Sequence, residues 1–447
     1  MTAALRLALC ATTLLSAALP SIAQEETRPP IVFVHGDSDS ASAWIAQIWR
    51  FESNGYPADR LFAVDIPSPS ARADDTVAEE NRSSTEDAAR AVAATVEEAL
   101  AASGADQVVL VANSRGCQTA RNYEKNLGGA GKVEAMVLTG CVHNGVYVAP
   151  DARPNAEYNG AGRFLTALNE GGLPEGVDVT IIRSDRFDLY AQESARFIGN
   201  PDGKTGVSFD APELDGAENI VLDGVDHRET AYSPQAFGVM YEAITGEAPQ
   251  TREIEAEAAP ELSGKVSAFV NGAPSNLGLE GAAVRVFAVD AGTGERMSET
   301  PAYEAVVAAD GRWGPFTAAQ DQAYEFVVEA EGEPTTRIYR SPFPRSSDLV
   351  NLRLYPEPSV GDAPLEGETV SLMRPRGYFG TDDGATLDGA PLAGLPARTD
   401  VPSVWRTAVA VEGDAPKTVT ASFGTETIAA RTSPQDADDR VWIELTY

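Results

Sequence analysis

Along the first 245 residues, short apolar runs alternate with stretches that have the period of an amphipathic helix, and this alternation constrains the fold most strongly. Strands that alternate with helices form a mainly parallel sheet covered on both faces. We therefore predict an α/β fold for this part. The expected strands are residues 31–34, 61–65, 107–112, 135–139, 177–183 and 219–222, and the expected helices are residues 85–102, 115–127 and 234–245.

The last 190 residues have a different pattern. Residues 247–260, EAPQTREIEAEAAP, are acidic and contain proline, which is typical of a linker. Short alternating runs separated by Gly, Pro and Asp follow, as in an all-β sandwich. A proline cluster from Pro356 to Pro364 divides them, so we predict a β-sandwich module at 261–356 and a second β-rich module at 366–447.

The N-terminus has the pattern of a secretory signal over residues 1–23. Arg6 gives the positive flank, residues 7–20 the apolar core, and Ser-Ile-Ala at 21–23 the cleavage site. The core is too short to span a bilayer, and no other stretch approaches the roughly 20 apolar residues of a transmembrane helix. We expect a secreted or periplasmic protein that begins at Gln24 and has no transmembrane segment.

The segment VVLVANSRGC, residues 108–117, suggests catalysis by a serine nucleophile. A predicted strand runs into a predicted helix, and Ser114 lies between them, at the edge of the sheet where ligands bind. The run Ala112-Asn113-Ser114-Arg115-Gly116 fits the nucleophile elbow, whose turn is so sharp that the residues two before and two after the serine must be small. This motif predicts Ser114 as a nucleophile.

A serine nucleophile needs a base and an orienting acid, which follow it in the order Asp, His in this kind of fold. The chain has three histidines, His35, His143 and His227. His227 comes directly after the strand 219–222 and before the last helix, where the base is expected. His35 precedes Ser114 in the chain, and His143 precedes the strands whose ends could supply the acid. We predict His227 as the base.

The acid is expected after the strand 177–183, where both Asp185 and Asp188 occur. Asp188 fits better because an apolar residue follows it, and Asp185, nearer the strand end, stays an alternative. We expect the unused aspartate to be a solvated loop carboxylate, and the same of Asp226 beside His227.

A tetrahedral intermediate needs backbone N–H groups aimed at its oxyanion. We predict that Arg115 N–H, at the positive end of a helix, and Asp37 N–H, in the loop after the first strand, supply them. The Asp37 carboxylate would oppose the oxyanion if it pointed inward, so we expect it to face solvent or to bond locally to Ser38–Ser40. We interpret His35 as a brace for this loop.

After removal of the signal two cysteines remain, Cys117 and Cys141. An even count in an exported protein suggests a disulfide. Cys117 lies in the first turn of the helix after Ser114, and Cys141 follows the next strand, so both lie toward one sheet edge. We predict a Cys117–Cys141 disulfide, with two buried free thiols as the alternative.

The segments VFVHGDS, ANSRGC, VLTGCVHNGV, RSDRFDLYAQ and GVDHRETAYSP resemble secreted α/β-hydrolase lipases and esterases, in particular bacterial and archaeal types with an appended C-terminal β-rich domain. The resemblance covers roughly residues 29–246, so a catalytic domain at 24–246 is expected. It implies Ser114, Asp188 and His227 as a triad, and Asp37 and Arg115 as the oxyanion hole. Ala112 replaces the usual elbow glycine, and Asp37 stands where lipases usually carry an apolar residue.

The β-rich part, with SGKVSAFVNG, LEGAAVRVFAVD and YEFVVEAEG, resembles carboxypeptidase-regulatory or transthyretin-like modules, which mostly act as spacers or attachment surfaces. We expect Trp313 in this part to be a core residue. Trp44 and Trp49 in ASAWIAQIWRF have two interpretations, either as the lining or lid of an acyl groove or as the core face of a helix. Because every expected catalytic residue precedes the linker, we expect the N-terminal part by itself, without the β-rich part, to hydrolyse small esters.

The function predicted from the sequence is a secreted serine ester hydrolase, a lipase or carboxylesterase, that cleaves neutral apolar esters through an acyl-enzyme on Ser114. The net charge of −33 disfavours nucleic acid and anionic membranes as partners, and it disfavours anionic esters where salt does not screen it. No cofactor or metal is expected. The alternatives are a polyester depolymerase of the polyhydroxyalkanoate type and a non-catalytic secreted binding or adhesion protein that uses its β modules.

Overall fold

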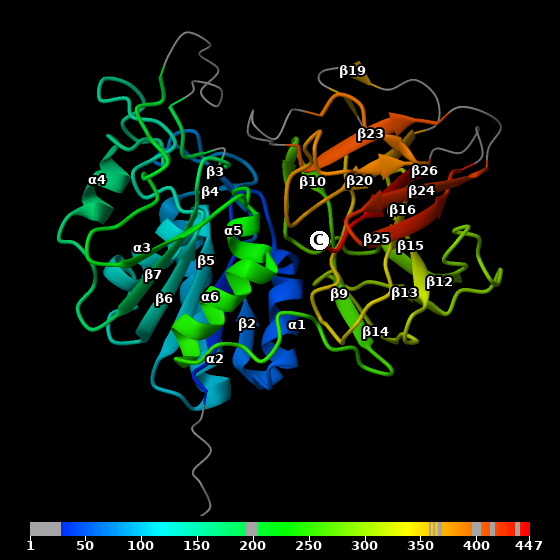
Figure 1. Cartoon of the computed structure of the whole chain (residues 1–447), viewed down its shortest axis with the longest axis horizontal. Helices are drawn as coiled ribbons and strands as arrows, with labels where there is room; N and C mark the ends of the chain where they lie inside the picture. Colours follow the sequence, from blue (N-terminus) through cyan, green and yellow to red (C-terminus); the bar gives the residue numbers. More distant parts are fainter. Residues whose placement is uncertain are drawn as a thin grey trace, which may run out of the picture.

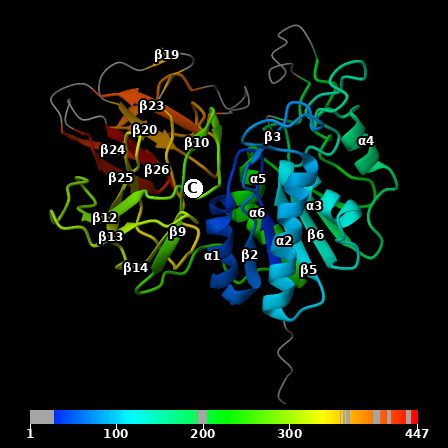
Figure 2. The same cartoon turned by 180° about the vertical axis from the view of Figure 1, so that it is seen from behind.

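The computed structural model describes residues 28–188, 190–193, 204–356, 359–360, 363–364, 369–395, 404–411, 416–433 and 439–447. The predicted signal, residues 1–23, and the expected mature start at Gln24 lie outside the described residues. An α/β part and a β-rich part lie side by side in both views (Figures 1 and 2). Within the described residues, none of the helices combines the length and the apolar character needed to cross a membrane.

The α/β part contains a six-stranded parallel sheet in the order β2-β1-β5-β6-β7-β8, which confirms the predicted fold class. Its strands are β1 (Ile31–Val34), β2 (Leu61–Ala63), β5 (Val108–Asn113), β6 (Val133–Thr139), β7 (Asp178–Ser184) and β8 (Glu218–Leu222). The helices are α1 (Ile45–Ser53), α2 (Thr85–Ser103), α3 (Arg115–Asn126), α4 (Arg163–Asn169), α5 (Glu229–Tyr232) and α6 (Pro234–Thr245). Two 3₁₀ turns, η1 (Ala41–Trp44) and η2 (Ala58–Arg60), and a short pair, β3 (Ser70–Ala71) and β4 (Arg82–Ser83), complete it.

Two apolar layers hold the helices against the two faces of this sheet. Side chains of neighbouring strand residues point to opposite faces, so Val32 packs with α2 and α3 in one cluster and Phe33 packs with α1 and α6 in the other. Local signals set some helix ends: α6 begins after Ser233, whose Oγ accepts from Ala236 N at 3.1 Å, and ends at Gly246 with φ 74°.

The order of the strands reverses at β1, which lies between β2 and β5. In open α/β sheets the ligand site lies at the carboxyl ends of the strands on either side of such a reversal. Here those ends lead into the loop that begins with His35 and into the turn at Ser114. The turn is tight, because a Cβ on Gly116 would lie 2.5 Å from Val34 O.

The β-rich part combines strands from both predicted modules in one sheet. Its order is β13-β12-β15-β16-β26-β20-β23, and β26 runs parallel to both β16 and β20. The proline-rich boundary predicted near residue 360 therefore does not separate two sheets. The strands are β9 (Glu261–Ser267), β10 (Phe269–Val270), β11 (Ala273–Pro274), β12 (Ala283–Val289), β13 (Tyr303–Val306), β14 (Arg312–Thr317), β15 (Ala323–Glu329), β16 (Thr335–Arg340), β17 (Leu352–Arg353), β18 (Ser359–Val360), β19 (Ala363–Pro364), β20 (Thr369–Met373), β21 (Thr386–Leu387), β22 (Ala390–Pro391), β23 (Arg406–Ala410), β24 (Thr418–Phe423), β25 (Glu426–Arg431) and β26 (Asp439–Glu444).

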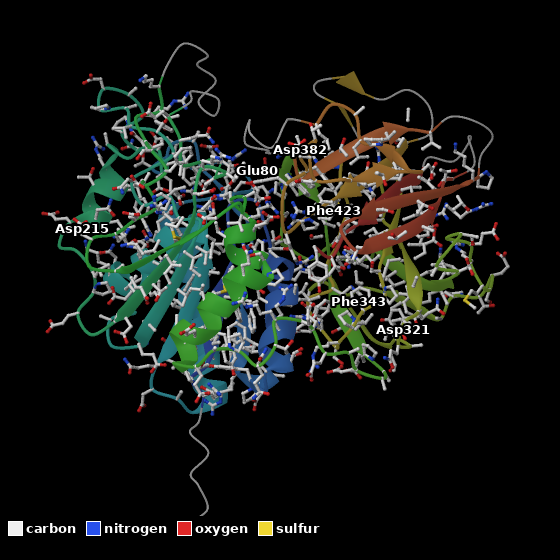
Figure 3. The ribbon with its side chains drawn as sticks, viewed as in Figure 1. Glu80, Asp215, Asp321, Phe343, Asp382 and Phe423 are labelled. Carbon is white, nitrogen blue, oxygen red and sulfur yellow. A yellow bond between two sulfur atoms is a disulfide. The ribbon has the colours of Figure 1, made fainter. Side chains whose placement is uncertain are left out.

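Helix α1 of the α/β part packs against the β-rich part. Trp49 is 2% exposed, packs edge-on against Phe343 of the β-rich part at 6.3 Å between ring centroids, and donates from Nε1 to Ser346 O at 2.8 Å. Phe343 is labelled in Figure 3. Trp44 is buried between Phe33 and Tyr232. Both tryptophans are therefore core residues, and the lid interpretation is wrong. Trp313 is also buried, as expected.

The predicted linker, residues 247–260, lies against α1. Thr251 O accepts from Asn54 Nδ2 at 2.9 Å, and Arg252 O accepts from Arg50 Nε at 3.0 Å. Glu255 N donates to Ser53 Oγ at 2.9 Å. The segment is therefore fixed to the surface of the α/β part by several hydrogen bonds, although its composition suggests a flexible connection.

Candidate active site

Ser114 forms the turn between β5 and α3 with φ 54° and ψ −120°, a strained conformation for a serine. Ser114 N donates to Thr139 O at 2.9 Å, and Ser114 O accepts from Cys117 N at 3.0 Å. Every residue from Val108 to Glu124 is buried except Ser114 itself. The fold therefore encloses the whole strand and the helix that follows it, and leaves this one side chain accessible at the tip of the turn.

His227 and Asp188 form a buried pair. Asp188 Oδ1 accepts from His227 Nδ1 at 2.9 Å and from Tyr190 N at 2.8 Å. The side chains are 3% and 2% exposed. The ring of Tyr190 packs edge-on against the imidazole with centroids 4.6 Å apart. His227 Nε2 is buried and has no hydrogen-bond partner among the described residues. The bond at Nδ1 leaves Nε2 available for another group.

Asp185, the alternative acid, has a different place. It is half-buried, and its carboxylate accepts from Phe187 N at 3.2 Å and from Gly224 N at 3.2 Å. These bonds connect the loop after β7 with the loop after β8. Of the two aspartates left open by the sequence, Asp188 is therefore the one that bonds to His227.

Asp226 was expected to be a solvated loop carboxylate, and this is wrong. It is 1% exposed, and its Oδ2 accepts from Tyr378 N at 2.7 Å while Oδ1 accepts from Arg228 N at 2.8 Å. Burial raises the pKa of Asp226 to about 7, helped by the charge of Glu229 and opposed by that of Arg374. The partners from the β-rich part, Tyr378 and Arg374, lie about 150 residues away in the chain, and no local sequence pattern predicts these contacts.

The loop after β1 is fixed by two of its own side chains. The Asp37 carboxylate accepts from Ser38 Oγ at 2.9 Å, a local bond as expected, and also from Ala71 N at 2.8 Å and Tyr158 OH at 2.9 Å. His35 Nδ1 donates to Gly36 O at 2.8 Å, and Nε2 accepts from Ile66 N at 3.2 Å. Burial lowers the pKa of His35. This neutral imidazole braces the loop, which agrees with the interpretation from the sequence.

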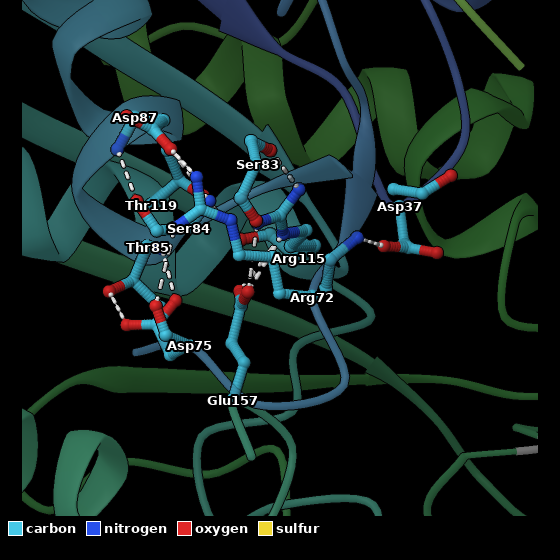
Figure 4. A network of polar contacts seen from close by, with 12 residues as sticks. Asp37, Arg72, Asp75, Ser83, Ser84, Thr85, Asp87, Arg115, Thr119 and Glu157 are labelled. Carbon is cyan, nitrogen blue, oxygen red and sulfur yellow. Dashed lines mark hydrogen bonds and ion pairs between the residues drawn. The ribbon is translucent and has the colours of Figure 1, made fainter. Parts of the chain in front are cut away.

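The side chain of Arg115 has a role that the sequence did not suggest. It is fully buried, and its Nε lies 3.0 Å from both carboxylate oxygens of Glu157 (Figure 4). Its Nη1 donates to Pro69 O at 2.8 Å and to Ser83 Oγ at 2.9 Å. Burial alone would lower the pKa of Arg115, but Glu157 raises it above its ordinary value. The residue after Ser114 thus connects α3 to two loops and to strand β4.

Cys117 and Cys141 form the predicted disulfide, with Cα atoms 5.7 Å apart. The alternative of two free thiols is wrong. The bond connects the first turn of α3 to the loop after β6, close to the turn that carries Ser114.

His143 lies apart from this group. It is fully buried, its Nδ1 lies 3.2 Å from Arg121 Nη1, and burial lowers its pKa well below the ordinary value. It is not among the described residues that line the pocket around Ser114.

Ser114 and His227 open into one pocket of about 630 Å³. One side is formed by the loop after β1, and the other by the β-rich part, which contributes among others Phe269, Tyr355, Tyr378 and Trp405. The β-rich part therefore forms one wall of the pocket. Across the described ranges, no group of three or more His, Cys, Asp or Glu side chains is arranged to hold a metal ion.

This fold, with a tight strand-to-helix turn at Ser114 and a buried Asp–His pair at one pocket, is that of an α/β hydrolase. Residues 31–248 match the α/β hydrolase family, and residues 259–356 match the lipase C-terminal domain. The two matches together show an α/β hydrolase of the lipase and esterase type followed by a C-terminal β domain.

Several solved lipase structures resemble the chain at low identity. Lipase B of Aspergillus fumigatus is 17% identical with a TM-score of 0.34, and the match covers 51% of this chain and 55% of that one. Lipase BlEst2 of Bacillus licheniformis in its mature form is 20% identical with a TM-score of 0.37, covering 49% and 94%. Its propeptide form is 16% identical with a TM-score of 0.38, covering 92% and 93%. No curated protein sequence matches the chain significantly.

Proposed function

We propose that the protein is an exported serine carboxylic ester hydrolase that acts through an acyl-enzyme on Ser114, with His227 as the base and Asp188 as its orienting acid. The observation that carries this proposal is the 2.9 Å bond between Asp188 Oδ1 and His227 Nδ1, which leaves the buried Nε2 unpaired in the pocket that Ser114 lines. The disulfide supports export, because such bonds persist in oxidising compartments.

In the first half of the reaction, His227 Nε2 accepts the proton of Ser114 Oγ as this oxygen attacks the ester carbonyl carbon. Asp188 holds Nδ1–H in place, so that Nε2 stays the acceptor and the imidazolium that forms is stabilised. The tetrahedral intermediate collapses, and His227 returns the proton to the departing alkoxide. In the second half, water takes the place of the serine hydroxyl, and His227 again accepts and returns the proton.

Arg115 N–H and Asp37 N–H are the proposed oxyanion donors. Among the described residues neither group donates to another backbone carbonyl. A Cβ on Gly36 would lie 3.1 Å from Ser114 Cβ, so the loop after β1 lies directly against the serine. The side chains of Arg115 and Asp37 are held by Glu157 and Tyr158, which fixes the backbone of both residues before substrate binds.

The substrate is expected to have an apolar chain, because aromatic rings from both parts line the pocket. A fluorophosphonate probe tests the mechanism: we expect one covalent adduct on Ser114 and none in Ser114→Ala. An unlabelled but folded protein would favour the binding or adhesion alternative. Rates on p-nitrophenyl esters of increasing length, an emulsified triglyceride and a polyester film separate carboxylesterase, lipase and polyester depolymerase.

A further inference from the structure

The pocket has an excess of positive charge, although the whole chain carries a net charge of −33. Its lining includes five arginines, at positions 153, 228, 353, 376 and 406, and three carboxylates, at positions 37, 39 and 444. The carboxylates already have partners. Asp37 is bonded to Tyr158 and Ala71 N, Asp39 pairs with Arg228 at 3.1 Å, and Glu444 pairs with Arg340 at 2.6 Å.

Arg353 and Arg406, here called the arginine pair, have no carboxylate partner among the described residues. Arg406 begins β23, and the ring centroids of Trp405, Tyr355 and Phe269 lie 5.3, 5.8 and 6.0 Å from its Cζ. Within the described part of the chain Arg353 donates to neutral groups alone, namely Ser267 Oγ, Ser38 O and Asn276 Oδ1. Arg406 is held against aromatic rings and has no hydrogen-bond acceptor among the described residues, so its guanidinium can bind a carboxylate.

Both members of the arginine pair line the pocket that Ser114 lines. The Tyr355 ring centroid lies 5.8 Å from Arg406 Cζ. Burial raises the pKa of Tyr355; the charges of Arg353 and Arg406 oppose that rise, and those of Glu444 and Asp39 add to it. Arg353 Nη1 lies 3.4 Å from Ser38 O, one residue from the proposed oxyanion donor. A group bound by the pair therefore sits in the same pocket as an ester bound at Ser114.

The direction of the pKa shift of Arg406 agrees with a positive charge that no carboxylate among the described residues neutralises. Burial lowers the pKa of Arg406, with a smaller opposing effect from Tyr355. Burial acts in the same direction on Arg228, but the Asp39 carboxylate raises the pKa of Arg228 above its ordinary value. Both arginines line the same pocket. They differ in that Arg228 has a carboxylate partner, whereas Arg406 has none among the described residues.

From the pocket lining, the contacts and the charges we propose that the arginine pair binds a carboxylate on the substrate, so that the enzyme prefers esters that carry a second, anionic group. This inference rests on the proposed function and names its substrate class. It replaces the expectation of a neutral ester, which followed from the net charge of the whole chain. Repulsion by distant surface charges is screened within about 10 Å at 0.1 M salt, whereas contacts inside the pocket are screened much less.

Two matched substrate pairs test the proposal and show on which side of the ester the carboxylate lies. Mono-p-nitrophenyl suberate is compared with p-nitrophenyl octanoate, and 4-acetoxybenzoate with its methyl ester. In one pair we expect kcat/KM to be roughly 10-fold or more higher for the anionic member, as a charge-assisted hydrogen bond would give. Arg406→Gln should remove most of this ratio, and Arg406→Lys should keep part of it.

Arg285→Gln is the matched control, because Arg285 lies outside the pocket lining and pairs with Glu304 and Glu329. We expect it to keep the wild-type ratio. Competition of monomethyl suberate against p-nitrophenyl acetate, with dimethyl suberate as the neutral comparison, needs only the wild-type protein and so does not depend on a folded variant. The monoanion should compete more strongly than the diester, and because pocket contacts are screened much less than surface charges, added NaCl should weaken this preference only in part.

Equal kcat/KM within both pairs, or a ratio that survives in Arg406→Gln, would overturn the proposal. If the wild-type protein cleaves neutral esters and labels at Ser114 but shows no preference for the anion, the substrate class fails and the proposed function stands. If it neither labels nor cleaves any of the four esters, the proposed function fails and this inference fails with it.

Discussion

Arg374 of the β-rich part and Asp226 of the α/β part form a buried ion pair, with 3.5 Å between Nη1 and Oδ2. The same arginine pairs with Glu229 through Nη2 at 2.5 Å, and Tyr378 N donates to Asp226 at 2.7 Å. Asp226 directly precedes His227. The loop that carries the proposed base is therefore held from the other part of the molecule.

Replacing Arg374 by alanine should leave Asp226 buried without its cation. Breaking a buried pair in this way costs about 3 kcal/mol, and we expect both the free energy of unfolding and kcat to fall. Denaturant titration and ester kinetics measure the two effects. Arg285→Ala, which breaks a partly exposed pair, should change stability by at most about 1 kcal/mol. An unchanged kcat in Arg374→Ala would show that the loop holds its geometry alone.

Ser114→Ala and His227→Ala should each abolish turnover, because the nucleophile and the base act as one unit. Asp188→Asn should lower kcat by about 10⁴ if it behaves as in the serine-protease triad. The matched control is Asp185→Asn, which we expect to keep most of the activity, since this carboxylate bonds to backbone N–H groups and not to His227. An inactive Asp185→Asn beside an active Asp188→Asn would reverse the assignment.

Reduction of the Cys117–Cys141 bond should lower the melting temperature and the activity together. The bond closes a loop with a sequence separation of 24 residues, which on the chain-entropy estimate corresponds to about 3 kcal/mol. It also fixes the start of α3, which carries the Arg115 N–H donor. The double variant Cys117→Ala/Cys141→Ala should reproduce the loss in the absence of reductant. Two titratable thiols in freshly purified protein would contradict the prediction.

The buried histidines His143 and His35 should each lower the stability of the fold as the pH falls below about 6.5, whereas Asp226, with its pKa raised to about 7, changes stability in the opposite direction. Burial lowers the folded-state pKa of His143 and of His35. At a pH between the folded-state pKa and the unfolded pKa of such a histidine, the unfolded chain binds the extra proton and the folded chain does not. Each such histidine contributes a slope of about 1.4 kcal/mol per pH unit in this window, and its contribution is complete above the unfolded pKa. Denaturation curves from pH 5 to 8 should therefore be flatter for His143→Gln, which we also expect to keep most of its activity.

A chain that ends at residue 258 should lose stability and activity, in contrast to the expectation from the sequence. The cut would expose Trp49 and would remove Arg374, Tyr378 and one wall of the pocket. Displacement of the His227 loop by about 1 Å is enough for a loss on the order of 10²-fold. Analytical ultracentrifugation and p-nitrophenyl acetate kinetics check this, and a monomeric truncation with the full rate would restore the original expectation.

Features that depend on neighbouring residues were predictable from the sequence. Helix α6 begins and ends where predicted, since Ser233, Pro234 and Gly246 are local signals. The turn at Ser114 and the disulfide follow from the spacing of residues along adjacent strands. The pairs Arg115–Glu157 and Asp226–Arg374 join segments 42 and 148 residues apart, and no periodicity connects them. The pattern of α1 likewise shows an apolar face, but not that its Trp49 packs against the β-rich part.

Strand β26 lies in the interior of the large sheet, between β16 and β20, and spans Asp439–Glu444. A growing polypeptide reaches Ser114, Asp188 and His227 long before it reaches this strand. The sheet that supports Arg374 and Arg406 cannot close until residue 444 has been synthesised. The newly made chain therefore carries all the groups proposed for ester cleavage well before it can assemble them, and its activity should arise as a late, single event in the maturation of the protein.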